Sequence, residues 1–308
     1  MTSSKFLKSL YELFLSEKIK VKSERVILSI AIVSFVIHLI IIYLVDFGII
    51  SLDESSDLLT NPIAAIYTPF SFILLYEVYL LIYYLPKSFT TYIGKQYEIM
   101  TLIVIRRLFK DISNLNLSSD WFKIKYDLNF TYDLVTSLIM FFLIFVFYLQ
   151  SREKHISIST KKPNVDALAK FIQIKKILAT FLMPVFIILS IYSFSSWLLG
   201  IIYSVEGNSN SFANINNIFF EQFFNVLIFA DVLLLLFSFF LTDQFHKVIR
   251  NSGFIISTIL IRVSFSTTGL VNNLLIICSV TFGLIIIIIY NKFEEQISLN
   301  KIDSNESD

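Results

Sequence analysis

The sequence predicts an all-α, polytopic membrane protein with about eight transmembrane helices, arranged as two four-helix repeats of parallel topology. Of its 308 residues, 56% are hydrophobic and only 16% are charged, and just 7 Gly and 5 Pro interrupt the chain. A soluble domain has about a quarter of its residues charged, whereas a membrane helix needs about 20 consecutive apolar residues. A further observation is a pattern of acidic and basic residues inside apolar segments that recurs in both halves.

Six apolar segments are long enough to span a bilayer, and two shorter ones lie among them. The six are 26–45, 63–85, 130–149, 177–203, 219–241 and 270–290, and the shorter two are 92–109 and 253–265. Because Lys and Arg favour cytoplasmic loops, the basic segment before residue 26 predicts an inner-membrane protein with both termini in the cytoplasm. The basic linker 151–176 then requires the segment 92–109 to cross. Basic residues within 107–131 conflict with this topology, so six crossings with two half-helices are the alternative.

The same pattern divides the chain into five parts. They are a cytoplasmic amphipathic N-terminus (1–25), a first four-helix unit (26–150), a basic cytoplasmic linker (151–176), a second four-helix unit (177–291) and an acidic cytoplasmic tail (292–308). Residues 4–16 place Phe6, Leu10, Leu13 and Phe14 on one helical face, which is typical of a helix lying in the membrane interface. Packing against a cytoplasmic surface explains that face equally well.

Each half contains a carboxylate and an arginine within apolar helices. Glu77 precedes Arg106 by 29 residues, and Asp231 precedes Arg262 by 31. Consecutive antiparallel helices are usually neighbours, and an unpaired charge in the bilayer costs several kcal/mol. We therefore expect each acid to meet its arginine near mid-bilayer. The pairs either fix the register between helices or form a gate, a relay or a coordination site.

Two further residues stand out in the apolar segments. Residue counting puts His38 at the depth of Glu77 and Arg106, where it either joins their network or shuttles a proton, or else bonds to a helix backbone. Pro184 is expected to kink its helix. No His/Cys cluster suggests a metal or haem, and no catalytic motif is present. The sequence therefore predicts no cofactor, no catalytic residues and no enzyme activity.

Four stretches carry a resemblance to a known family: "YEVYLLIYYL" from Tyr76, "IVIRRL" from Ile103, "YDLV" from Tyr132 and "QSREK" from Gln150. Together they resemble the phosphate-starvation-inducible E (PsiE-like) proteins, small bacterial membrane proteins of four helices. The resemblance covers roughly 74–154 and, more weakly, 228–295, and it implies two fused units in the inner membrane without an established chemistry. The second unit departs from the first, since it has Asp231 for Glu77 and Gly269 for Asp133.

Two functions from different classes fit these features. The first is an ion channel, pore or permease, built as a homo-oligomer, with the charge pairs near its path. The alternative is a non-conducting signalling, stress or defence effector that acts through a partner protein in the membrane or cytoplasm. The lipid bilayer is the common partner, and the balanced net charge of +1 gives no indication of nucleic-acid binding.

Overall fold

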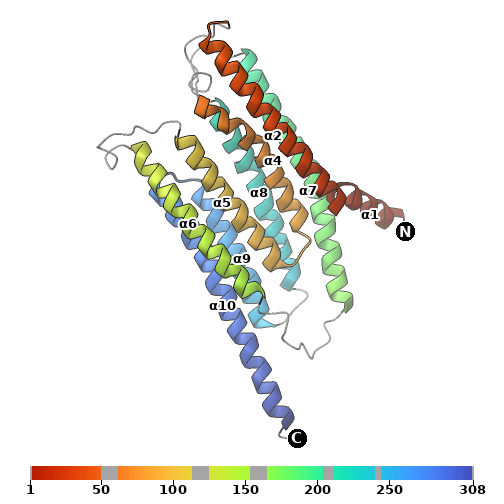
Figure 1. Cartoon of the computed structure of the whole chain (residues 1–308). Coiled ribbons are helices and arrows are strands. Elements are labelled where there is room, and N and C mark those ends of the chain that lie inside the picture. The colour runs from red at the N-terminus through yellow and green to blue at the C-terminus, as the bar shows by residue number, and fades with distance from the viewer. Residues whose placement is uncertain are drawn as a thin grey trace. The chain divides into compact units, whose positions relative to one another are not determined.

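The computed structural model describes residues 2–49, 62–112, 125–152, 165–203, 211–239 and 244–306, and these ranges are almost entirely helical, with no strand (Figure 1). In chain order the elements are α1 (Thr2–Leu15), α2 (Glu17–Asp46), η1 (Pro62–Ile66), α4 (Tyr67–Tyr84), α5 (Phe89–Ile112), α6 (Lys125–Arg152), α7 (Val165–Tyr203), α8 (Ser211–Phe239), α9 (Phe245–Ser264) and α10 (Leu270–Glu306). The predicted all-α class is confirmed.

Five helical segments in the described ranges are long and apolar enough to cross a membrane. They are Phe6–Asp46, Asp127–Ser151, Ala169–Tyr192, Gln222–Phe239 and Leu270–Asn300, and α4 contributes the shorter apolar segment Thr68–Tyr84. These segments support the prediction of a helical membrane protein. Helices α5 and α9 are not among the five, because polar and charged residues recur along both. Eight crossings and the parallel repeat therefore stay predictions.

The chain bends between α1 and α2 (Figure 1), and side-chain contacts on both sides of the break hold it in place. Ser16, the N-cap of α2, has extended backbone angles, and its Oγ accepts a hydrogen bond from the Ile19 N–H at 3.4 Å. Tyr79 of α4 donates its hydroxyl to the Phe14 carbonyl at 3.0 Å, which satisfies an acceptor in the last turn of α1. Because the ends of a helix leave backbone groups unsatisfied, these contacts fix where α1 stops and α2 starts.

The other end of α2 closes in a Schellman motif. The Ile49 N–H donates to the Leu44 carbonyl at 3.0 Å, and the Gly48 N–H donates to the Val45 carbonyl at 2.9 Å. Gly48 has a φ of 71°, which lies in the left-handed region that glycine adopts without a steric penalty. The predicted apolar segment 26–45 thus ends within a residue of the observed helix.

The chain forms two compact units, and each takes segments from both halves of the sequence. Unit 1 comprises Met1–Tyr83, Leu102–Leu134 and Ile177–Val226, and unit 2 comprises Tyr84–Thr101, Val135–Lys176 and Leu227–Asp308. Helices α5, α6, α7 and α8 each contribute one part to unit 1 and the other to unit 2. The predicted repeats, 26–150 and 177–291, divide the chain at other positions than these two units do. They stay a prediction.

In unit 1 the core surrounds α4, whereas α2 exposes a long apolar face. Leu74, Val78 and Leu81 of α4 are buried, with at most 1% of their surface exposed. On α2, by contrast, Ile32 is 64% exposed and Ile40 is 52% exposed. A continuous apolar face of this kind is unusual on a soluble protein and is typical of a helix that faces lipid.

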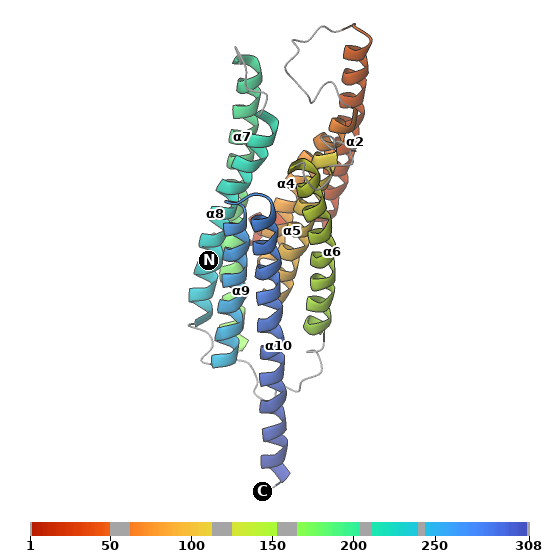
Figure 2. The same cartoon turned by 90° about the vertical axis from the view of Figure 1, so that its left-hand side faces the viewer.

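In unit 2, α9 and α10 run antiparallel and side by side (Figure 2), joined by a short connection that ends at Gly269. Tyr97 of α5 reaches this pair, and its hydroxyl lies 2.7 Å from Ser257 Oγ, which in turn donates to the Ser279 carbonyl at 2.6 Å. Gly283 makes room for the tyrosine, since a Cβ there would lie 1.8 Å from the Tyr97 hydroxyl oxygen.

This close approach predicts that Gly283→Ala destabilises the protein by about 1–3 kcal/mol, the usual cost of overpacking. The reason is that the added methyl group must displace the Tyr97 hydroxyl. In a Tyr97→Phe background, where that hydroxyl is absent, the same substitution should cost less. Thermal unfolding of the four proteins in detergent measures both losses, and equal losses in the two backgrounds would contradict the predicted clash.

Candidate functional site

Glu77 and Arg106 form a buried ion pair in unit 1. Glu77 lies on α4 with 3% of its surface exposed, and Arg106 lies near the end of α5 with 7% exposed. Arg106 Nη2 donates to Glu77 Oε2 at 2.5 Å. The two helices are consecutive and antiparallel, and Phe70 of α4 stacks on Phe109 of α5 further along the same contact, with 5.0 Å between ring centres. The contact predicted for the first half of the sequence is therefore present.

The neighbouring Arg107 forms a second ion pair, which the sequence analysis missed. Its Nε lies 3.2 Å from Asp133 Oδ2 of α6, and the Asp133 side chain is buried whereas that of Arg107 is 33% exposed. Adjacent residues on a helix point about 100° apart, so one arginine faces α4 and the next faces α6. Asp133 is the acid in the "YDLV" stretch, and the Arg106–Arg107 dipeptide is the signal that could have predicted two partners.

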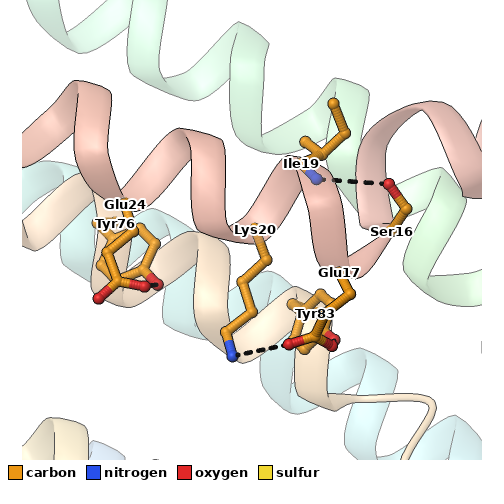
Figure 3. A network of polar contacts seen from close by, with 7 residues as sticks. All are labelled: Ser16, Glu17, Ile19, Lys20, Glu24, Tyr76 and Tyr83. Atoms are coloured by element: carbon orange, nitrogen blue, oxygen red, sulfur yellow. Dashed lines mark hydrogen bonds and ion pairs between the residues drawn. The ribbon is translucent and has the colours of Figure 1, made fainter.

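Contacts between α2 and α4 set the level of the Glu77–Arg106 pair (Figure 3). Tyr76 donates to Glu24 Oε2 at 3.0 Å, and Tyr83 donates to Glu17 Oε2. Glu77 is consequently level with the residues next to Glu24, which precede the apolar segment 26–45. The pair therefore packs beside the first turns of α2, and its position near mid-bilayer stays a prediction.

His38 is not level with Glu77, so it does not join the Glu77–Arg106 network, which was one of the alternatives expected for it. Its Nδ1 contacts the hydroxyl of Thr68 in the first turn of α4. Thr68 is nine residues from Glu77, or about 14 Å along a helix. Because α4 is only 18 residues long and meets α2 from the first turn of α2, His38 faces the far end of α4 and does not contact Glu77.

In unit 2, Asp231 of α8 is buried, with 2% of its surface exposed, and it does not pair with Arg262. Gln96 Nε2 donates to Asp231 Oδ2 at 3.4 Å. The Tyr92 hydroxyl and the Lys175 ammonium lie close enough to act on the carboxylate electrostatically, but the Tyr92 hydroxyl makes no hydrogen bond of normal geometry to the described residues. Among the described residues, no Lys or Arg nitrogen lies within ion-pair distance of Asp231. The predicted second pair is therefore wrong.

The register of α8 against α9 explains the difference. Asn251 of α9 donates to Ser238 of α8 at 3.5 Å, so in this antiparallel pair Asp231 is level with about residue 258. Arg262 is one turn further along α9, about 6 Å beyond that level. The two sequence spacings are similar, 29 residues from Glu77 to Arg106 and 31 from Asp231 to Arg262. They could not reveal this offset, because it depends on how α9 follows α8.

Lys175 is the cation that acts electrostatically on Asp231, and it is held by other groups. Its Nζ donates to the Lys87 carbonyl at 2.8 Å and lies 4.2 Å from the centre of the Phe89 ring and 5.0 Å from that of Phe171. A carbonyl dipole and aromatic faces both stabilise a buried ammonium. The lysine thus acts on Asp231 through space and is not bound to it.

Glu77, Asp133 and Asp231 are therefore compensated in two different ways. Glu77 and Asp133 each have a guanidinium at contact distance, which neutralises the carboxylate in place. Asp231 instead has an amide donor, a hydroxyl and a more distant ammonium. A carboxylate of the second kind can change its protonation state without breaking an ion pair, which is what a proton relay requires.

Two further features considered in the sequence are Pro184 and the residues that could bind a metal ion. Pro184 lies inside α7, which is assigned as one helix from Val165 to Tyr203, and its kink stays a prediction. Within the described residues, no group of three or more His, Cys, Asp or Glu could hold a metal ion.

We predict that Arg106→Ala destabilises the protein more than the double substitution Glu77→Ala/Arg106→Ala. The single change leaves a buried carboxylate without its partner, a loss of about 3–5 kcal/mol, whereas the double change removes both charges. Arg107→Ala is the comparison. It also leaves a buried carboxylate, that of Asp133, but it should cost less because the 33% exposed Arg107 side chain shows that water already reaches this pair. Thermal unfolding in detergent gives all three values, and a double variant less stable than Arg106→Ala would show that the two charges do not depend on each other.

No protein-family model, curated protein or solved structure matches this chain. The resemblance to the PsiE-like proteins therefore stays a prediction that rests on the quoted stretches alone.

Proposed function

We propose that the chain is an eight-helix membrane protein that passes protons through unit 2, with Asp231 as the group that takes up and releases the proton. The observation that carries this proposal is a carboxylate with 2% of its surface exposed and no cation at contact distance in the described residues. Ionisable residues in membrane helices are rare and usually mark ion or proton paths. Several apolar helices around it supply the membrane setting.

The groups around Asp231 favour a proton over a metal cation. Gln96 donates its amide N–H to the carboxylate, and the hydroxyl of Tyr92, one helical turn earlier on α5, lies near it. Donors of this kind stabilise an ionised carboxylate. A desolvated metal cation instead needs several oxygen ligands, and one carboxylate surrounded by donors does not supply them.

Further polar side chains are buried in the same unit. Ser257, Thr258 and Asn251 of α9 are at most 6% exposed, as is Ser279 of α10. The Tyr97–Ser257–Ser279 contacts join three helices within this unit. Such groups provide hydrogen-bonding positions inside an otherwise apolar bundle, and they support a path on which water or protons can be held.

Helices α5 and α9 fit as interior crossings. Helix α9 has 20 residues and α5 has 24, which give lengths of about 30 and 36 Å, enough for the hydrocarbon layer. Their polar residues are tolerated because many of them are buried against other helices, as Asn251, Ser257 and Thr258 are on α9. This supports eight crossings, while the proposal of cytoplasmic termini in a cell inner membrane rests on the distribution of basic residues along the sequence.

The proton path predicts that the purified protein acidifies or alkalises liposomes under an imposed potassium potential, measured with an enclosed pH dye. Asp231→Asn should reduce the flux at least about tenfold, since its amide cannot exchange the proton, while Asp231→Glu should keep part of it. Tenfold corresponds to about 1.4 kcal/mol in the barrier.

The control is the charge-neutral replacement Glu77→Gln/Arg106→Met, which changes the buried pair of unit 1 and should leave the flux within about twofold of wild type. Folding of every variant is checked by its elution volume and unfolding temperature. Absence of flux from folded wild-type protein, or full flux from Asp231→Asn, would overturn the proposal.

The topology predicts that the two ends of α9 lie on opposite sides of the membrane. Single cysteines at Gln244 and Thr268, both exposed, are introduced into a Cys278→Ser background and treated with an impermeant maleimide on intact cells. Thr268→Cys should react and Gln244→Cys should react only after lysis. Labelling of both in intact cells would indicate six crossings with a half-helix at α9.

A further inference from the structure

The first two turns of α2 carry charges of both signs, and the acidic ones are turned toward α4. Glu17 and Glu24 accept hydrogen bonds from Tyr83 and Tyr76, and Lys20 lies between them, 3.5 Å from Glu17 (Figure 3). The Lys20 ammonium also lies 5.4 Å from the centre of the Tyr83 ring. These three residues follow a spacing of three and four, so they share one face of the helix.

The opposite side of the same turns is basic. Lys18, Lys22 and Arg25 are spaced by four and three residues and are all exposed. None of them has an ion-pair partner in the described part of the chain. Exposed lysine and arginine side chains on an integral membrane protein, close to an apolar run, are well placed to meet lipid headgroups.

The basic face continues directly into the lipid-exposed face of α2. Counting about 100° per residue, Val36 and Ile40 lie on the side of the helix that carries Lys18 and Lys22, and they are 47% and 52% exposed. A phospholipid bound here would place its acyl chains along the apolar stripe and its phosphate beside the cations. An acidic residue on this face would repel the phosphate, but Glu17 and Glu24 lie on the α4 side.

Helix α1, which directly precedes α2, has an exposed apolar side of its own. Phe6 and Leu13 are 65% and 58% exposed, and their spacing of seven puts them on one side of the helix. Lys8 is exposed as well, and it has no ion-pair partner among the described residues. This combination is typical of a helix that lies in the interface of an anionic membrane.

We propose that Lys18, Lys22 and Arg25 form a binding site for one anionic phospholipid of the cytoplasmic leaflet. The proposal rests on the charge separation around α2 and on the continuity of the basic and apolar faces. It is independent of proton movement at Asp231, so either can fail alone.

Native mass spectrometry of the full-length protein in detergent tests the site with phosphatidylglycerol and with phosphatidylcholine of the same acyl chains. Wild type should bind phosphatidylglycerol more tightly. Lys18→Gln/Lys22→Gln/Arg25→Gln should weaken phosphatidylglycerol binding at least about tenfold and leave phosphatidylcholine binding unchanged, since each cation near an anionic headgroup contributes several-fold.

The matched control removes the same net charge elsewhere, by Lys170→Gln/Lys247→Gln/Lys292→Gln, and should keep the preference for phosphatidylglycerol. Equal losses in both triple variants would reduce the effect to net charge and overturn the site, as would a preference that survives the first triple variant. If that variant does not fold, a photoactivatable phosphatidylglycerol on wild type decides. Cross-links within 18–40 support the site, and their absence there overturns it.

Discussion

The structure depends on one constraint: a charged side chain buried among apolar helices has lost its hydration, so polar or charged groups of the protein must stabilise the charge instead. Breaking a buried pair costs more than never having made it. In the described chain this constraint is met by contacts between different helices, as in Glu77 with Arg106 and Asp133 with Arg107. Because each partner comes from a different helix, meeting the constraint also fixes how far one helix is shifted along the next.

The way in which the constraint is met separates structural acids from the functional candidate. A guanidinium at contact distance holds a carboxylate ionised and the two helices together, so Glu77 and Asp133 are suited to maintaining register. Asp231 is compensated by Gln96, Tyr92 and the more distant Lys175. Protonating Asp231 gives up weaker contacts than protonating Glu77 would, and this difference in cost makes it the better proton site.

The sequence predicted the class of the fold and the Glu77–Arg106 contact, because apolar length and the adjacency of consecutive helices are local rules. It failed for Asp231 with Arg262 and for the position of His38 along α4, because both depend on the shift between helices. That shift is set by where connections begin and end, as at the break before Ser16, which lets α2 meet α4 from its first turn. The sequence shows Arg107 as a charged residue, but its partner could be identified only from the direction in which each side chain points around α5.

Helix α5 takes part in the contacts of all three buried acids. Its last turns carry Arg106 and Arg107, which bind acids of α4 and α6 in unit 1, and its first turns carry Tyr92 and Gln96, which face Asp231 in unit 2. Helix α5 thus carries polar and charged groups on both sides of its apolar stretch 99–105, and for that reason it is not among the long apolar helices. A helix whose polar groups contact other helices need not be apolar, because lipid never reaches those groups. The polar residues that hid α5 from a hydropathy count are therefore the same residues that make it the partner of three buried acids.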